Sequence, residues 1–228
     1  MRRTDTAYRG RMPVPRIDEP DLPECMTWDE LEQLPENIAQ QIELWGGRVV
    51  WARRGPAEHQ MFTVRMRNAM ESCARKSTSD NSDTRWRVNV ETNVFLGDNG
   101  KSDFLTPDFL IHRCLESAYQ DVRAADTLLV GEVHSPSNTR SDMEAKKCRY
   151  AGAGIPWYWE VILARHTSAI AVVRAYALET GHAQLPVGVR PPHPANYLVA
   201  GEWTPADEHG VRIEFPFPIT IDWSDLEY

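Results

Sequence analysis

Residues 127–133 read Thr127-Leu128-Leu129-Val130-Gly131-Glu132-Val133, and this run is apolar enough to predict a central strand of a sheet. Shortly before it, Pro107-Asp108-Phe109-Leu110-Ile111-His112 predicts a second strand. Further towards the N-terminus, residues 86–96 alternate apolar and polar side chains, which indicates a half-buried strand. These three strands place a sheet at the centre of the fold.

Helices and further strands are predicted after this apolar run. They are a helix over residues 141–150 with its C-cap near residues 152–154, strands at 158–163 and 169–178, and short β-runs at 197–203 and 211–221. Strands and helices do not alternate regularly. The sequence therefore predicts a mixed α/β (α+β) domain with a central sheet flanked by helices.

The N-terminal part of the chain has its own signals. Residues 1–26 are rich in proline and lack apolar periodicity, which predicts a flexible arm before a single domain at residues 27–228. The domain opens with a capping box, Thr27-Trp28-Asp29-Glu30, and a short helix to about Leu34. The elements predicted next are a hairpin at 42–51 around Gly46-Gly47, a long helix from His59 to about Arg75, and a polar loop at 77–83.

The composition excludes several classes of protein. The chain has 228 residues, 42% of them apolar, and a formal net charge of −8. No stretch approaches the ~20 consecutive apolar residues of a membrane helix, and the first residues lack the apolar segment of a secretory signal. The four cysteines are far apart and form no C-x-x-C pair. We therefore expect a cytoplasmic protein with reduced thiols and no membrane partner.

Three acidic residues lie in stretches that otherwise favour apolar side chains: Asp108, Glu132 and Glu43, the last within Ile42-Glu43-Leu44. Burying a carboxylate is costly unless it binds a cation or accepts hydrogen bonds. Two carboxylates on adjacent strands can lie ~5 Å apart on one face, and carboxylate oxygens are ligands that Mg²⁺ takes. Simpler explanations exist for two of them, because Asp108 could be a turn residue and Glu43 a hairpin surface residue.

A lysine follows on the next predicted helix. Lys146 lies one turn after Asp142, and the spacing of Asp142, Lys146 and Tyr150 puts all three on one stripe of the helix, whereas Lys147 falls outside it. Two acids on neighbouring strands with a nearby lysine are the arrangement expected for metal-assisted hydrolysis of a phosphodiester, in which the lysine offsets developing negative charge. The simpler reading of Lys146 and Lys147 is a solvated helix face.

Several of these segments together resemble the Uma2 family, formerly domain of unknown function 820, which is assigned to restriction endonucleases of the PD-(D/E)XK nuclease superfamily. The resemblance covers about residues 26–225. The segments that carry it are Met26-Thr27-Trp28-Asp29-Glu30-Leu31, Leu34-Pro35, Ile42-Glu43-Leu44 with Gly47 and Val49, His59, Pro107-Asp108, Gly131-Glu132-Val133-His134-Ser135-Pro136-Ser137, the spaced Asp142, Lys146 and Tyr150, and Gly154-Ile155-Pro156 with Tyr158-Trp159.

The resemblance implies a restriction-endonuclease-like core and a site that binds Mg²⁺ or Mn²⁺. Asp108 and Glu132 would be metal ligands, and Glu43 an additional acid of the catalytic and metal-binding set. Lys146 would take the lysine role from the helix, because the usual E-x-K position holds His134. His134 could be a ligand, a proton-transfer group or a polar substitution.

Two functions remain open from the sequence. The first is a Mg²⁺-dependent endonuclease acting on DNA, with His134, Asp142 and His59 as accessory residues. The intact acids and lysine favour it. The second is an inactive member that keeps the fold as a binding or assembly module. With either function the protein could form a homodimer. The acidic net charge implies that DNA is bound weakly or through a local basic surface. The candidates for that surface are Arg53, Arg54, Arg65, Arg67, Arg75 and Lys76.

Overall fold

The computed structural model describes residues 21–52, 55–80, 85–97, 100–134, 138–179 and 195–227, so most of the predicted arm, residues 1–20, lies outside the described residues. The helices are α1 (Trp28–Leu31), α2 (Glu36–Ala39), α3 (Ala57–Asp80), the 3₁₀ turn η1 (Ala124–Asp126), α4 (Arg140–Gly152) and α5 (Trp223–Leu226). The strands are β1 (Ile42–Trp45), β2 (Arg48–Trp51), β3 (Trp86–Val90), β4 (Val94–Phe95), β5 (Phe104–Leu105), β6 (Phe109–Arg113), β7 (Val122–Arg123), β8 (Thr127–His134), β9 (Trp157–Leu163), β10 (Ile170–Glu179), β11 (Asn196–Trp203), β12 (Val211–Ile213) and β13 (Ile219–Ile221).

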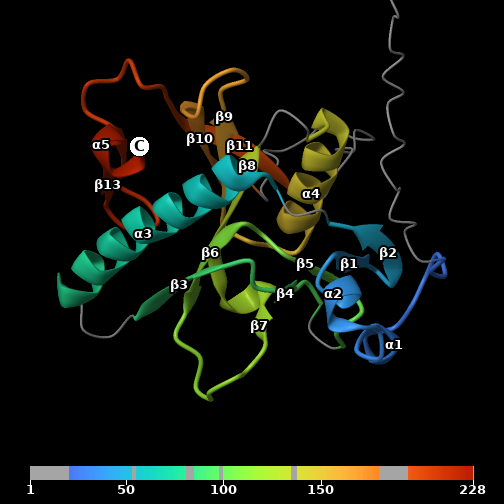
Figure 1. Ribbon diagram of the computed structural model, residues 1–228. Coiled ribbons are helices and arrows are strands. Elements are labelled where there is room, and N and C mark those ends of the chain that lie inside the picture. Colours follow the sequence, from blue (N-terminus) through green and yellow to red (C-terminus); the bar gives the residue numbers. More distant parts are fainter. Residues whose placement is uncertain are drawn as a thin grey trace, which may run out of the picture.

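The larger sheet has six strands in the order β11-β10-β9-β8-β6-β3. Strand β8 is central, as its apolar sequence predicts, and it runs parallel to β9 and antiparallel to β6. Helix α4 makes the crossover between the two parallel strands. The predicted mixed sheet flanked by helices is thus confirmed (Figure 1).

The two faces of this sheet bury different sets of side chains. On one face, Leu129 and Val133 of β8 belong to a core cluster with Phe62, Met66 and Met70 of α3. On the other face, alternate residues of the sheet pack with Tyr150 of α4 in a second cluster. Glu132 alternates with Gly131 and Val133, so its side chain points to the α4 face.

The smaller sheet has five strands in the order β2-β1-β5-β4-β7. The predicted hairpin is confirmed: β1 pairs with β2, and Gly46 and Gly47 both have positive φ (63° and 84°), which suits the tight turn between them. Helices α1 and α2 cover part of this sheet (Figure 1), and the capping box of Thr27 and Glu30 is present. Helix α1 ends at Leu31, earlier than predicted.

The prediction of one strand over residues 86–96 is wrong. Strand β3 pairs with β6 in the larger sheet, whereas β4 pairs with β5 and β7 in the smaller one. The chain bends between them at Glu91, which has φ 41° and donates its backbone N–H to the Asp108 carbonyl at 3.2 Å. Val94 falls on the same alternate positions as the buried Val88, so periodicity alone could not reveal the bend.

The prediction of a polar loop at 77–83 is also wrong over residues 77–80, which continue α3 to Asp80, while residues 81–83 lie outside the described residues. Ion pairs of Glu71 with Arg67 and Arg75, each four residues away, support the solvent-facing side of this long helix. No helix within the described residues is both long and apolar enough to cross a membrane.

Candidate active site

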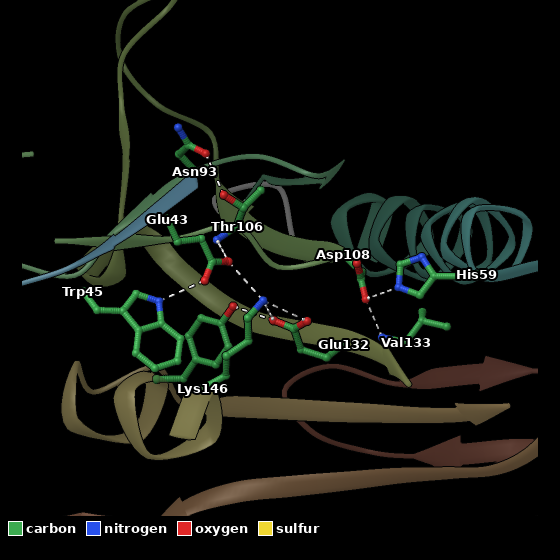
Figure 2. A network of polar contacts seen from close by, with 10 residues as sticks. Glu43, Trp45, His59, Asn93, Thr106, Asp108, Glu132, Val133 and Lys146 are labelled. Carbon is green, nitrogen blue, oxygen red and sulfur yellow. Dashed lines mark hydrogen bonds and ion pairs between the residues drawn. The ribbon is translucent and has the colours of Figure 1, made fainter. Parts of the chain in front are cut away.

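A cavity of about 1170 Å³ opens between the two sheets and is lined from both of them. The five residues that matter most for its chemistry come from five places in the fold: Glu43 in β1, His59 in α3, Asp108 just before β6, Glu132 in β8 and Lys146 in α4. The structure thus brings together Asp108, Glu132, Glu43 and Lys146, as the sequence predicts, with His59 beside them (Figure 2).

Asp108 is fixed where β6 begins. The register pairs Phe109 of β6 with Gly131 of β8, which sets Asp108 beside Glu132 on the neighbouring strand. Its Oδ2 accepts the Val133 N–H at 2.6 Å and the His59 Nε2–H at 3.0 Å. Among the described residues no hydrogen bond to Oδ1 is found.

His59 is hydrogen-bonded to this aspartate. Its side chain is only 8% exposed. Although burial disfavours the charged imidazolium, the hydrogen bond to Asp108 and the nearby negative charges raise the pKa of His59 above its usual value. His59 therefore orients Asp108 and tends to neutralise it.

Glu132 is buried beneath α4. Its Oε1 accepts the Tyr150 hydroxyl at 2.8 Å and lies 3.2 Å from Lys146 Nζ. Burial raises the pKa of Glu132 to about 7; the Lys146 ammonium opposes this shift, and the negative charges of Asp108 and Glu43 add to it. Burial and the neighbouring acids together thus favour the protonated form of Glu132 more than in an exposed glutamate.

Lys146 lies between two acids from different sheets. Its Nζ is 3.0 Å from Glu43 Oε1 as well as 3.2 Å from Glu132 Oε1. Although burial favours the neutral amine, the charges of Glu132, Glu43 and Asp108 raise the pKa of Lys146 above its usual value. Lys146 thus carries a fixed positive charge at the centre of the site.

A further buried carboxylate, Glu160, adjoins the site. The register of the parallel strands aligns Glu132 of β8 with Glu160 of β9. Glu160 lies 3.0 Å from Lys147 Nζ and accepts the Tyr176 hydroxyl at 2.8 Å, with Arg174 at 3.4 Å. The reading of Lys147 as part of a solvated helix face is therefore wrong, because its side chain is only 13% exposed and binds a buried acid.

The remaining accessory residues are less closely engaged. Asp142 lines the cavity, but it is exposed and its carboxylate accepts the Thr139 hydroxyl at 2.5 Å, at the start of α4. His134 ends β8 and is absent from the described lining of the cavity. Its Nε2 is buried without a hydrogen-bond partner among the described residues, and burial lowers the pKa of His134.

Tyr150 and Trp45 are site residues that the sequence reasoning did not single out for their contacts. The Trp45 indole N–H donates to Glu43 Oε2 at 2.9 Å, and the Tyr150 hydroxyl donates to Glu132. Tyr150 had a detectable signal, because it lies four residues after Lys146 on the same helical stripe. Trp45 had a weaker one, since residues i and i+2 of a strand share a face.

The described lining of the cavity is strongly acidic. Lys146 is the one lysine or arginine in this described lining. The carboxylates of the lining are Glu32, Glu43, Glu91, Asp108, Asp121, Glu132 and Asp142. Of the basic residues proposed to bind DNA, Arg67 and Arg75 pair with Glu71, and Arg53 and Arg54 lie outside the described residues. The cavity therefore needs added cations to accept a polyanion.

The donor chemistry suits a hard divalent cation at Asp108 and Glu132. Both residues offer carboxylate oxygens from adjacent strands, which are the ligands that such a cation takes. Within the described residues, no group of three His, Cys, Asp or Glu side chains lies close enough together to hold a metal ion without rearrangement.

Comparisons with known proteins agree with the resemblance seen in the sequence. A family model for Uma2, described as "Putative restriction endonuclease", matches residues 28–193. The crystal structure of a putative nuclease belonging to DUF820 from Anabaena variabilis ATCC 29413 is similar in fold, with a TM-score of 0.54 and 14% sequence identity over 88% of this chain and 97% of that one. No curated protein matches the chain.

Proposed function

Because the chain belongs to the Uma2 family, we propose that it is a metal-dependent endonuclease that hydrolyses DNA phosphodiester bonds in the acidic cavity. One observation carries this proposal: Asp108 and Glu132 lie beside each other on adjacent strands, and the Lys146 ammonium is 3.2 Å from Glu132. Two acids and one lysine are the groups that the reaction needs, and each is held by several contacts.

Asp108 and Glu132 would hold the cation, which we propose to be Mg²⁺ or Mn²⁺. When bound, such an ion polarises a phosphoryl oxygen and lowers the pKa of a coordinated water. Asp108 is oriented for this task by His59 and by the Val133 N–H. Glu132 is oriented by Tyr150.

In this hydrolysis, water adds its oxygen to phosphorus, the bond to one ester oxygen breaks, and that oxygen leaves with a proton. Negative charge accumulates on the phosphoryl oxygens as the water attacks. Lys146 is a permanent cation whose side chain is largely buried, and a fixed charge held in this way stabilises such a transition state more than one in bulk water would.

The second candidate is a non-catalytic binding or assembly module with the same fold. The observation in its favour is the acidic lining of the cavity, which repels the phosphates of DNA. The intact set of Glu43, Asp108, Glu132 and Lys146 favours the nuclease.

The proposal is tested by incubating plasmid, linear duplex and single-stranded DNA with the purified protein in Mg²⁺, Mn²⁺ or EDTA. We expect metal-dependent cleavage that is lost in Asp108→Asn and in Glu132→Gln, while the circular dichroism spectrum is unchanged. Cleavage by either variant at the wild-type rate would remove that residue from the site. A wild-type protein that cleaves none of the substrates would favour the binding module.

A further inference from the structure

Both oxygens of the Glu43 carboxylate are already engaged. Oε2 accepts the Trp45 indole N–H at 2.9 Å, and Oε1 accepts the backbone N–H of Thr106 at 3.0 Å. Oε1 also lies 3.0 Å from Lys146 Nζ. The side chain is only 1% exposed, so these protein contacts rather than bulk water satisfy its carboxylate.

Asp108 differs from Glu43 in its hydrogen bonds and in the sheet that it borders. Among the described residues only its Oδ2 accepts hydrogen bonds, and it lies beside Glu132 on the adjacent strand of the larger sheet. Glu43 comes from β1 of the smaller sheet. Figure 2 shows Lys146 Nζ between Glu43 and Glu132, with Asp108 beyond Glu132.

These contacts give Glu43 and the metal ligands different tasks. A lysine side chain has several rotatable bonds, so holding its ammonium at one point requires fixed partners. Glu132 alone is a poor partner, because a divalent cation on its oxygens would repel the ammonium. Glu43 provides an anchor that does not depend on the metal.

We propose that Glu43 is a positioning residue for Lys146 rather than a ligand of the metal. Strand β1 holds the ammonium in the cavity when Asp108 and Glu132 bind a divalent cation, and Trp45 and Thr106 fix Glu43 in turn. This inference rests on the proposed function and assigns one residue of that site a role different from the additional metal-binding acid implied by the resemblance.

The experiment measures the affinity for Mn²⁺ separately from the rate of DNA cleavage. Mn²⁺ affinity is measured by electron paramagnetic resonance in wild type, Glu43→Gln, Glu132→Gln and Lys146→Met, and DNA cleavage is followed in single turnovers. We expect Glu43→Gln to bind Mn²⁺ within about twofold of wild type, whereas Glu132→Gln binds it at least about tenfold more weakly.

The rates should show that Glu43 acts through Lys146. We expect Glu43→Gln to slow cleavage by about 10- to 100-fold. The double variant Glu43→Gln/Lys146→Met should be no slower than Lys146→Met alone, because the residue to be positioned is already gone. Trp45→Phe, which removes only the indole donor, should show a smaller loss of rate with unchanged Mn²⁺ affinity.

Two results would overturn the inference: a loss of Mn²⁺ affinity in Glu43→Gln as large as in Glu132→Gln, or multiplicative rate losses in the double variant. A wild-type protein that neither binds Mn²⁺ nor cleaves DNA would instead refute the proposed function. In that case, urea unfolding of Glu43→Gln, Lys146→Met and the double variant without metal tests whether Glu43 and Lys146 are coupled. Non-additive losses of stability support the Glu43–Lys146 pairing, and additive losses overturn it.

Discussion

The carboxyl group of Glu132 is buried between a lysine and two further acids, and this setting makes the stability of the metal-free protein depend on pH. Its pKa is about 7 in the folded protein, against 4.5 for an ordinary glutamate. Between these two values the folded state binds more protons at this site than the unfolded state does. The free energy of unfolding therefore falls as the pH rises through this window.

We predict that this slope disappears in Glu132→Gln. The difference in unfolding free energy between wild type and variant should fall by up to about 3 kcal/mol from pH 4.5 to pH 7.5, given about 1.4 kcal/mol for each unit of pKa. Urea unfolding in EDTA at several pH values measures it, and the titrating groups that do not interact with Glu132 cancel in the comparison. Parallel stability curves for the two proteins would contradict the prediction.

At the scale of single residues, the cost of burying charge was the informative signal. It identified Glu132 and Glu43, because each interrupts an apolar strand, and both are buried in the structure. The donors that satisfy them were harder to find. The Thr106 backbone N–H comes from a distant turn, and nothing in the spacing of the sequence connects it to Glu43.

Two adjacent lysines of helix α4 pair with acids on two adjacent strands. Lys146 contacts Glu132 of β8 and Lys147 contacts Glu160 of β9, and the strand register aligns these two acids. Both lysines are largely buried, but only Lys146 is among the residues that line the cavity in the described part of the chain. The helix thus supplies one charge to the cavity and uses the other to bind the sheet.

The two lysines should therefore differ in effect. We predict that Lys146→Met slows DNA cleavage by about 100- to 1000-fold, the range for removing one preorganised charge or donor at a transition state. Its matched control, Lys147→Met, should leave the rate within about tenfold and instead lower the unfolding free energy by about 3 kcal/mol or more, because Glu160 loses a buried partner. Single-turnover cleavage and urea unfolding give both numbers. Equal losses of rate would contradict the assignment.

The elements were predictable wherever packing follows a simple period. Strand β8 and the hairpin of β1 and β2 follow from apolar pattern and turn glycines. The division of residues 86–96 between two sheets did not follow from them, because β4 has only two residues and Val94 falls on the same alternate positions as Val88. The short strands β5 and β7 have only two residues each, too few to show a period.

The charge of the whole molecule limits how it can hold DNA. The net charge is −8, and the described cavity lining carries seven carboxylates against one lysine. Binding through phosphate neutralisation alone should therefore be weak, and a divalent cation at Asp108 and Glu132 should strengthen it by removing repulsion at the site.

We predict that Ca²⁺, used as a cation that does not support cleavage, increases DNA affinity by about tenfold or more over EDTA. The dependence on salt should be shallow, since each neutralised phosphate contributes about −0.9 to the slope of log K against log salt. Fluorescence anisotropy with labelled DNA measures both quantities. Asp108→Asn should lose the effect of Ca²⁺, and undetectable binding in both conditions would favour the non-nuclease alternative.

The cavity takes its functional groups from both sheets and from α4, and this has a consequence for the chain during its synthesis. Glu43 leaves the ribosome early, Asp108 and Glu132 later, and Lys146 last of the four. Until α4 has closed over β8, the acids exist without the ammonium and without a common pocket. If the chain is the nuclease proposed above, this order is a safeguard, because a nascent or truncated chain without Lys146 would lack one of the groups that cleavage needs.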